Sequence, residues 1–349
     1  MAFGLFRRRV FRCGAALFVT AFGMNNPAAL AADANYHVEQ TWKLGGDGGW
    51  DYLTVDAQAQ LLYITRGNRV MVVDVTTGKL VGEIPGFQGI HGVALDADGK
   101  FGYVSDGRGG AVRVFDRGSR QLVASIPVGK GPDAILFEPT KKYVLSMNGG
   151  SNDVSVVDTA SNQVVATIPL PGRPEFATTD GKGAVFLNIE DKNELARIDV
   201  NTLKVTATWP LAPCESPSGL AIDAAKRRLF SVCDGKIMAV TDADSGKVVA
   251  TPTVGEGPDA AAFHGGLAFS SNGQDGTLTV VRQDSADRYT VSQTVSTKKG
   301  ARTMALDEST GKVYLVTADF GPRPAATTEN PRPRPAILPG TFSVIVVGP

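Results

Sequence analysis

Short phrases of four to six residues, either apolar or alternating in polarity, recur along the chain between Gly, Asp, Asn and Pro residues. Stretches of that length with turn residues at both ends are typical of β-strands. The first set of four phrases consists of Asp51–Asp56, Leu61–Thr65, Val70–Asp74 and Leu80–Pro85. The pattern predicts an all-β chain of short antiparallel strands.

The four-phrase set returns with a period of about 40 residues, which is the spacing of a β-propeller blade. The residue that closes the first phrase marks the copies at Asp56, Asp96, Glu138, Asp180, Asp223, a degenerate position near His264, and Asp307. We therefore predict a single seven-bladed β-propeller over residues 36–349, with four-stranded antiparallel blades.

The last copy has expected strands at Thr303–Asp307, Val313–Thr317 and Phe342–Val347, but its fourth phrase is missing. The segment His37–Gly45 resembles a fourth phrase and precedes the first blade. We expect this N-terminal strand to close the last blade, because pairing the two ends of the chain leaves no long sheet edge open.

A turn that begins with Asp follows several third phrases, at Asp74, Asp158, Asp199 and Asp242. We expect each carboxylate to accept backbone N–H groups inside its turn, with Gly or Asn in the left-handed position. These aspartates are therefore interpreted as structural.

Two of the phrases carry a resemblance to a known family. Tyr63–Asn68 with Val70–Asp74, and Ile126–Asp133 leading into the next copy, resemble the YVTN repeat of the YncE-like β-propeller family. The resemblance covers residues 36–349 and implies an exported propeller without a common catalytic constellation. It implies binding of a ligand, a partner or nucleic acid, and related propellers include lactone hydrolases and lyases. The fourth and sixth copies depart from the Tyr-Val-Thr-Asn phrase, which weakens the transfer of function.

Residues 1–31 differ from the repeats and are predicted to be a signal peptide. Four arginines precede an apolar run at Ala15–Met24, and Ala29–Ala31 provides the small residues of a cleavage site. The run is too short to span a bilayer core of about 30 Å. Arg8–Arg9 fits a twin-arginine signal as well as general secretion, so the export route stays open. Both routes predict a periplasmic or secreted protein.

Charge argues against nucleic acid as the main partner. Without residues 1–31 the chain keeps 31 basic and 35 acidic side chains, a formal charge of −4. A nucleic-acid surface would need a basic stripe to neutralise phosphates. We expect a monomer that binds a small polar ligand or a protein partner.

Two cysteines, Cys214 and Cys233, remain in the mature sequence. They are a candidate disulfide in an oxidising compartment, and two buried thiols are the alternative. With three scattered histidines they form no zinc-type spacing.

Candidate ligand-binding residues come from loops that enter first strands and leave second strands, since these loops share one face around the propeller axis. The first-strand entries have Asp51, His91, Asp133, Glu175, Ser218, Asp259 and Arg302. The second-strand exits have Arg66, Asp106, Asn148, Glu190, Asp234, Asn272 and Asp319. A turn position alone would favour Asp, Asn or Gly, whereas the first set varies. We therefore predict a polar funnel that binds a ligand, with turn caps and rim residues as the alternative.

This mixed set of charges suits a small polar molecule, a divalent cation or a basic side chain. We assign no cofactor and no catalytic residue. Calcium is the cation that the oxygen donors of Glu175, Asn148, Asn188 and Asp259 would suit.

The leading prediction is a binding protein. One alternative is a metal-assisted hydrolase or lyase of the lactonase type on the same face. A second is single-stranded nucleic-acid binding, with Trp50, Tyr52 and Phe176 as candidates for base stacking.

A proline-rich insertion at 321–340 separates the second and third strands of the last copy. Its proline density favours extended polyproline II conformation. Arg323, Arg332 and Arg334 give it positive charge. A lid over the funnel, a docking strip and a flexible tether are the three interpretations.

Overall fold

The computed structural model describes residues 1–4, 35–328 and 333–349. The predicted signal peptide lies outside these residues from position 5 onward. The chain divides into the units Met1–Leu30 and Ala31–Pro349, and every strand belongs to the second. Across the described ranges, no helix has both the length and the apolar character that a bilayer crossing requires.

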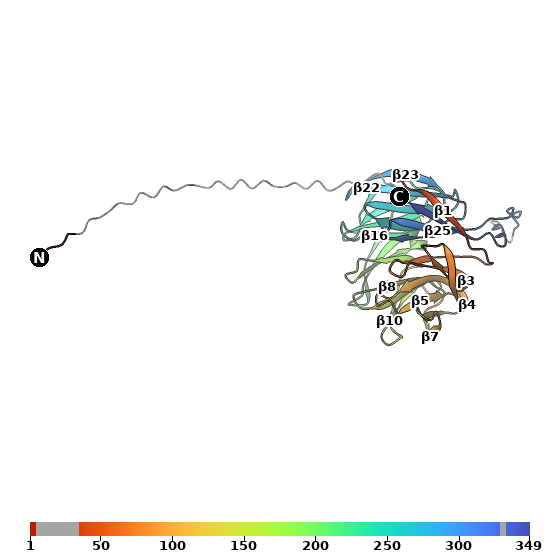
Figure 1. The fold of residues 1–349 in the computed structure, drawn as a ribbon, viewed down its shortest axis with the longest axis horizontal. Coiled ribbons are helices and arrows are strands. Elements are labelled where there is room, and N and C mark those ends of the chain that lie inside the picture. The colour runs from red at the N-terminus through yellow and green to blue at the C-terminus, as the bar shows by residue number, and fades with distance from the viewer. Residues whose placement is uncertain (5–34, 329–332) are drawn as a thin grey trace. The chain divides into compact units, whose positions relative to one another are not determined.

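The strands of the described residues form six antiparallel sheets, five with four strands and one with six (Figure 1). The six-stranded sheet contains β2 (Leu53–Asp56), β3 (Leu61–Asp74), β4 (Lys79–Leu95), β5 (Phe101–Asp106), β6 (Ala111–Asp116) and β7 (Leu122–Pro127). The next sheet contains β8 (Pro132–Glu138), β9 (Tyr143–Asn148), β10 (Asp153–Asp158) and β11 (Gln163–Pro169).

The remaining sheets follow in chain order. One contains β12 (Pro174–Thr179), β13 (Ala184–Ile189), β14 (Glu194–Asp199) and β15 (Lys204–Pro210), with the 3₁₀ turn η1 (Glu190–Lys192) after β13. The next contains β16 (Glu215–Asp223), β17 (Arg228–Asp234), β18 (Ile237–Asp242) and β19 (Val248–Ala250). Then come β20 (Pro258–His264), β21 (Leu267–Asn272), β22 (Thr277–Ser285) and β23 (Arg288–Ser296). The last sheet has the order β1 (His37–Lys43), β26 (Ser343–Gly348), β25 (Lys312–Thr317) and β24 (Met304–Asp307).

The protein is therefore a six-bladed propeller, and the predicted number of seven blades is wrong. The first two repeat copies share one sheet, because β3 and β4 each run through a position where a break between strands was expected. A backbone pair between Gly67 and Ile90 joins the two copies. Within this sheet Tyr63 and Val72 of the first copy pack on Val104 and Phe115 of the second, so the sheet folds over its own core.

The two ends of the repeat region meet in one sheet. β1 pairs antiparallel with β26 from His37–Gly348 to Lys43–Ser343, and β1 lies beside the C-terminal strands in Figure 1. The predicted pairing of the N-terminal strand with the last copy is thus present. It makes the sheets a closed ring, which brings the first-strand entries of distant repeats together.

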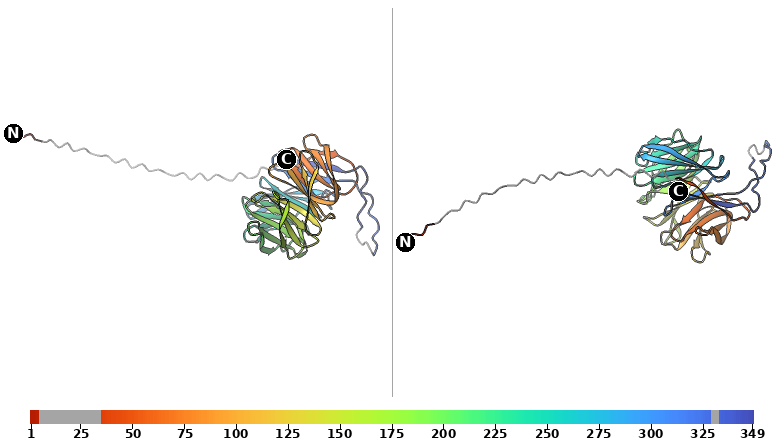
Figure 2. Two further views of the ribbon diagram at one scale, coloured as in Figure 1. Left: turned by 90° about the horizontal axis from the view of Figure 1, so that it is seen from below. Right: turned by 45° about the horizontal axis from the view of Figure 1, so that its top comes forward.

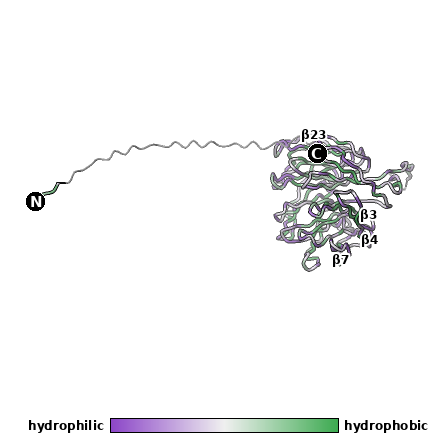
Figure 3. The backbone as a smooth tube through the Cα atoms, viewed as in Figure 1, coloured by the Kyte–Doolittle hydropathy of each residue, from purple (hydrophilic) through white to green (hydrophobic). Residues whose placement is uncertain are grey.

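Apolar residues of neighbouring sheets form shared buried clusters. Hydrophobic and hydrophilic segments alternate along the backbone (Figure 3). Phe230 of β17, for example, packs on Phe263 of β20 with parallel rings 5.0 Å apart. Each such layer buries side chains of two sheets at once, so adjacent sheets stabilise each other.

The Asp-initiated turns have the predicted hydrogen bonds. Oδ1 of Asp74 accepts the backbone N–H groups of Thr76 and Thr77 at 2.8 and 2.9 Å. Hydrogen bonds from Thr76 and Thr77 lower the pKa of Asp74. Gly78 then takes the left-handed conformation with φ 67°, and the ring of Trp42 lies directly against it.

The described part of the proline-rich insertion projects from the sheet body in both views of Figure 2. Its base is a short ribbon, in which Phe320 pairs with Ile337 and the Gly321 N–H donates to Ala336 O at 2.8 Å. Residues 329–332, which include Arg332, lie outside the described residues.

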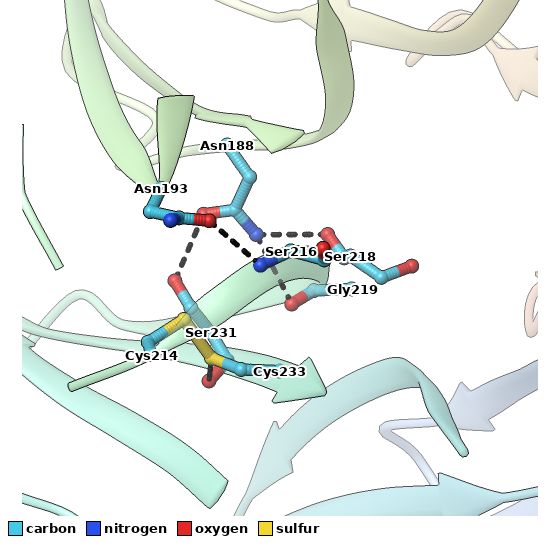
Figure 4. The surroundings of a disulfide bond; sticks show 8 residues. All are labelled: Asn188, Asn193, Cys214, Ser216, Ser218, Gly219, Ser231 and Cys233. Atoms are coloured by element: carbon cyan, nitrogen blue, oxygen red, sulfur yellow. Dashed lines mark hydrogen bonds between the residues drawn. A yellow bond between two sulfur atoms is a disulfide. The ribbon is translucent and has the colours of Figure 1, made fainter. Parts of the chain in front are cut away.

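Cys214 and Cys233 form a disulfide between the segment before β16 and strand β17 (Figure 4). Both residues are buried. Next to them, Asn188 donates to the carbonyl oxygen of Ser218 at 2.8 Å and accepts from the Ser231 hydroxyl at 2.9 Å.

Candidate functional site

The first-strand entries are held in place by side chains of second strands that belong to the preceding repeat. The Thr65 hydroxyl donates to the carbonyl oxygen of His91 at 2.8 Å. Asn188 does the same for Ser218, as described above. The hydroxyls of Ser105 and Ser271 donate to the carbonyl oxygens of Asp133 and Arg302. Of these buried polar residues, Thr65, Ser105 and Ser271 were not selected from the sequence, because nothing in the polarity pattern distinguishes them from other strand residues.

Three predicted residues from three successive repeats make one group of polar contacts. His91 Nδ1 lies 2.7 Å from Asp51 Oδ2 and 3.5 Å from Asp133 Oδ1. The two carboxylates are each 19% exposed, and the imidazole is 37% exposed. The histidine is thus placed between two partly buried acids.

The same group continues through the last repeats. Arg302 Nη2 lies 3.3 Å from Asp51 Oδ1, and its Nη1 makes a close ion pair with Asp259. The Ser218 hydroxyl donates to Asp259 Oδ1 at 3.1 Å. Six of the seven predicted first-strand entries therefore form one continuous arc, from Asp133 through His91, Asp51, Arg302 and Asp259 to Ser218. We call these six residues, together with Glu175 and Tyr52, the axial cluster.

Glu175, the seventh entry residue, joins the arc through Tyr52. The Tyr52 hydroxyl donates to Glu175 Oε1 at 3.2 Å, and its ring meets Phe176 edge-on with centroids 5.2 Å apart. Arg173 approaches Glu175 Oε2 at 3.5 Å and Glu190 at 3.0 Å. Phe176 and Tyr52, candidates for base stacking, thus pack on each other.

Burial shifts three acids of the axial cluster, Glu175, Asp133 and Asp259, toward their neutral forms. Burial, with the nearby charges of Asp133 and Glu190, raises the pKa of Glu175 to about 8. Burial also raises the pKa values of Asp133 and Asp259. Because a low-dielectric site disfavours an uncompensated carboxylate, a bound positive charge would be stabilised here.

His91 is shifted in the complementary direction. The hydrogen bond that His91 donates to the Asp51 carboxylate raises the pKa of His91, against the opposing effect of burial, and the charge of Asp133 adds to the increase. Burial, with the charges of Glu175 and Asp133, holds the pKa of Tyr52 well above its usual value. Tyr52 is therefore a neutral donor at physiological pH.

Most second-strand exits do not join the axial cluster. Arg66 is 1% exposed, and its guanidinium donates to the carbonyl oxygens of Gly49, Asp47 and Gly48 at 3.1, 2.9 and 3.1 Å. Buried Asp106 accepts the Gly89 N–H at 2.9 Å. These two side chains shape loops of their own sheet.

The amides at two further exits also act within their own sheets. Asn148 donates to Asp153 and Ser155 at 2.6 and 2.9 Å. Asn272 donates to Thr277 and Thr279 at 3.0 and 2.9 Å. Glu190 lies in η1 and forms an ion pair with Arg173. Because Arg173 also approaches Glu175, Glu190 is linked to the axial cluster through this shared arginine.

One group in the described part of the chain has donors spaced for a metal ion. Single donor atoms of Asp51, His91 and Asp133 all lie within 4.8 Å of one another. Of the oxygen donors named for calcium, Asn148 is hydrogen-bonded inside its own sheet, and Asn188 is hydrogen-bonded to Ser218 and Ser231 of the next sheet. A nitrogen and two carboxylates fit a transition-type cation better than calcium, which prefers oxygen donors alone.

Trp50 lies beside the base of the insertion, away from the hydrogen bonds of the axial cluster. Its ring centroid is 5.4 Å from Phe342 and 6.1 Å from Phe320. It therefore acts as packing between the insertion and the sheet that closes the ring.

No protein-family model and no curated protein matches the sequence. Solved structures match the fold. A chain of Kuenenia stuttgartiensis hydrazine synthase aligns with a TM-score of 0.67 at 19% identity, over 78% of this chain and 94% of that one. A chain of the mitotic checkpoint complex aligns with a TM-score of 0.72 at 12% identity, over 98% of both chains. The U3-55K structure aligns with a TM-score of 0.71 at 11% identity, over 90% and 99%. At these identities the likeness shows the propeller fold alone.

Proposed function

We propose that the protein is an exported propeller that binds a small, positively charged polar ligand at the axial cluster. The observation that carries the proposal is the continuous arc of six side chains from six separate strand entries. A turn cap needs only its own loop, whereas these side chains contact residues of other repeats and stay partly exposed. Convergent polar groups of this kind orient small ligands.

The charges favour a cation. The arc contains three aspartates against one arginine and one histidine, and Arg302 already pairs with Asp51 and Asp259. Asp133 has only His91 as its charged partner within the arc. An ammonium or amidinium group beside Asp133 and Glu175 would favour the charged forms of both acids.

Export and family membership are supported by the sequence. The repeat phrases resemble those of YncE-like propellers, and an arginine-rich start followed by an apolar run fits a signal peptide. The buried disulfide fits an oxidising compartment such as the periplasm or the extracellular space.

Thermal-shift titration tests the proposal, with putrescine and choline as cationic probes and succinate as an anionic one. We expect the cationic probes to raise the melting temperature, since a ligand at a hundred times its Kd stabilises the folded state by about 2.7 kcal/mol. Replacing His91→Ala together with Asp133→Asn should abolish that increase. The matched control is Asp98→Asn, which removes an exposed acid that pairs with Lys142.

Equal ligand shifts in the axial variant and the control would contradict the proposal. So would stabilisation by succinate alone. Circular dichroism spectra of both variants show whether the fold is retained.

A second candidate is a metal-assisted hydrolase or lyase, favoured by the spacing of Asp51, His91 and Asp133. A bound cation there would polarise an ester carbonyl, and Glu175 would supply a proton-bearing carboxyl group near neutral pH. Elemental analysis after dialysis against zinc and manganese decides this: one equivalent of metal that His91→Ala removes supports it. Absence of stoichiometric metal excludes it.

A further inference from the structure

One cavity of the described residues is separate from the axial cluster. It has a volume of about 410 Å³ and opens where the two repeat copies of the six-stranded sheet join. Its walls come from the loop before β2, the bend of β3, the middle of β4 and the loop after β5. The lining residues are Asp47, Gly48, Arg66, Gly67, Asn68, Arg69, Gln88, Gly89 and Arg108.

The charge of this cavity is opposite to that of the axial cluster. Three guanidinium groups, those of Arg66, Arg69 and Arg108, line it with a single carboxylate, that of Asp47. Glu83, which is not part of the lining, binds Arg69 at 2.8 Å. The cavity therefore keeps an excess of positive charge.

Arg66 forms the buried part of this charge. It makes no ion pair with a carboxylate in residues 35–328 and 333–349. Its N–H groups donate hydrogen bonds to backbone carbonyl oxygens instead. Its guanidinium carbon lies 3.7 Å from the centroid of the Phe342 ring. Burial and the charge of Arg69 lower its pKa to about 10. A buried charge without a counter-ion is costly, and an anion in the adjoining cavity would reduce that cost.

Arg108 is the group free to contact a ligand. It is exposed and makes no hydrogen bond or ion pair with the part of the chain that the structure describes. Its stem lies flat on Gly89, where a Cβ atom would meet Cγ at 2.9 Å. Glycine thus lets the side chain lie across β4 at the cavity wall. The planar guanidinium can hold a carboxylate or phosphate through two parallel hydrogen bonds.

We propose that this cavity binds a small anionic ligand through a carboxylate or phosphate group. Arg108 would contact the ligand, and the buried guanidinium of Arg66 would provide a fixed positive charge in the cavity lining. Asn68 and Gln88 add amide donors at the wall. The site does not depend on the proposed function of the axial cluster, because no residue is shared between the two.

Isothermal titration calorimetry of the full mature protein with sodium phosphate and with succinate tests the proposal. We expect saturable binding of at least one of them, and at least a tenfold loss of affinity in Arg108→Ala. Phosphate-only binding assigns phosphate esters, succinate-only binding assigns carboxylates, and binding of both assigns a general anion site. Arg288→Ala, which removes an arginine that is 78% exposed on β23, should bind as the wild type does.

Two further measurements locate the site. Phenylglyoxal should modify Arg108, and the bound anion should protect it while Arg288 stays reactive. The axial variant His91→Ala with Asp133→Asn should keep anion binding, so a failure of the axial proposal is distinguishable. No saturable binding of either anion, or equal affinity in Arg108→Ala, would overturn the inference.

Discussion

The hydroxyl of Tyr52 donates to Glu175 Oε1 at 3.2 Å, although the two residues are 123 positions apart. Tyr52 lies at the entry to β2, and Glu175 lies in β12. Their contact exists because the closed ring brings these entries together. It connects Glu175 to the arc, because Tyr52 follows Asp51 directly in the sequence.

Glu175 should make the stability of the protein depend on pH. Its pKa is raised to about 8, mainly by burial, whereas an unfolded chain has the ordinary value of 4.5. Between these values the folded state binds more protons, so the free energy of unfolding falls as pH rises. The full difference corresponds to at most about 5 kcal/mol, and coupling to Asp133 and Glu190 will reduce it. Urea unfolding at pH 5, 6.5 and 8 measures the slope.

The variant Glu175→Gln isolates this effect. It keeps the acceptor for Tyr52 and removes the titration, so its stability should vary less with pH and exceed that of the wild type at pH 8. Glu308→Gln, which changes an exposed acid, is the control and should keep the wild-type slope. Parallel slopes in all three proteins would show that Glu175 is not the group responsible.

Arg302 is predicted to stabilise the arc. Replacing it with Gln leaves Asp51 and Asp259 without their shared cation, in positions that are 19% and 22% exposed. Because 41% of the Arg302 side chain is exposed, solvent screening limits the loss to about 1–2 kcal/mol in the free energy of unfolding. A double-mutant cycle with Asp259→Asn, followed by chemical denaturation, measures the coupling. Additive effects of the two substitutions would contradict a direct interaction.

The sequence predicted the all-β fold and the pairing of the chain ends for a simple reason. Strand phrases are local, and the missing fourth phrase of the last copy had one candidate replacement at His37–Gly45. The number of blades could not be obtained in the same way. The first two repeat copies share one sheet because of one backbone pair between β3 and β4, that of Gly67 with Ile90. The pattern of side-chain polarity does not reveal such a backbone pair.

The candidate site shows the same division. Register alone placed Asp51, His91 and Arg302 at equivalent entries, and the closed ring made them neighbours. Register also selected Arg66 and Asn148, but their donors bind groups of their own sheets. The polarity of a side chain indicates that it needs hydrogen-bond partners. Whether those partners lie in a loop of its own sheet or in the axial cluster depends on packing in three dimensions.

The disulfide between Cys214 and Cys233 should stabilise the protein and be quantifiable by thiol counting. The double substitution Cys214→Ala, Cys233→Ala opens a loop with a sequence separation of 19, which the chain-entropy estimate values at about 3 kcal/mol. Ellman's reagent under denaturing conditions should find no free thiol in the mature wild type. Two reactive thiols, or an unchanged unfolding free energy in the double variant, would contradict a formed bond.

Gly78 should be more sensitive to substitution than its conformation alone requires. Gly78 has φ 67° and Gly110 has φ 59°, so alanine at either position enters the left-handed region at a cost of about 1–2 kcal/mol. At Gly110 a new Cβ atom meets nothing within 4 Å, whereas at Gly78 it would meet the Trp42 ring at 2.6 Å. Gly78→Ala must therefore also displace Trp42, which belongs to the strand that closes the ring. We expect it to lose at least about 1 kcal/mol more than Gly110→Ala in urea unfolding. Equal losses would mean that Trp42 moves without cost and contributes little to holding β1 in place.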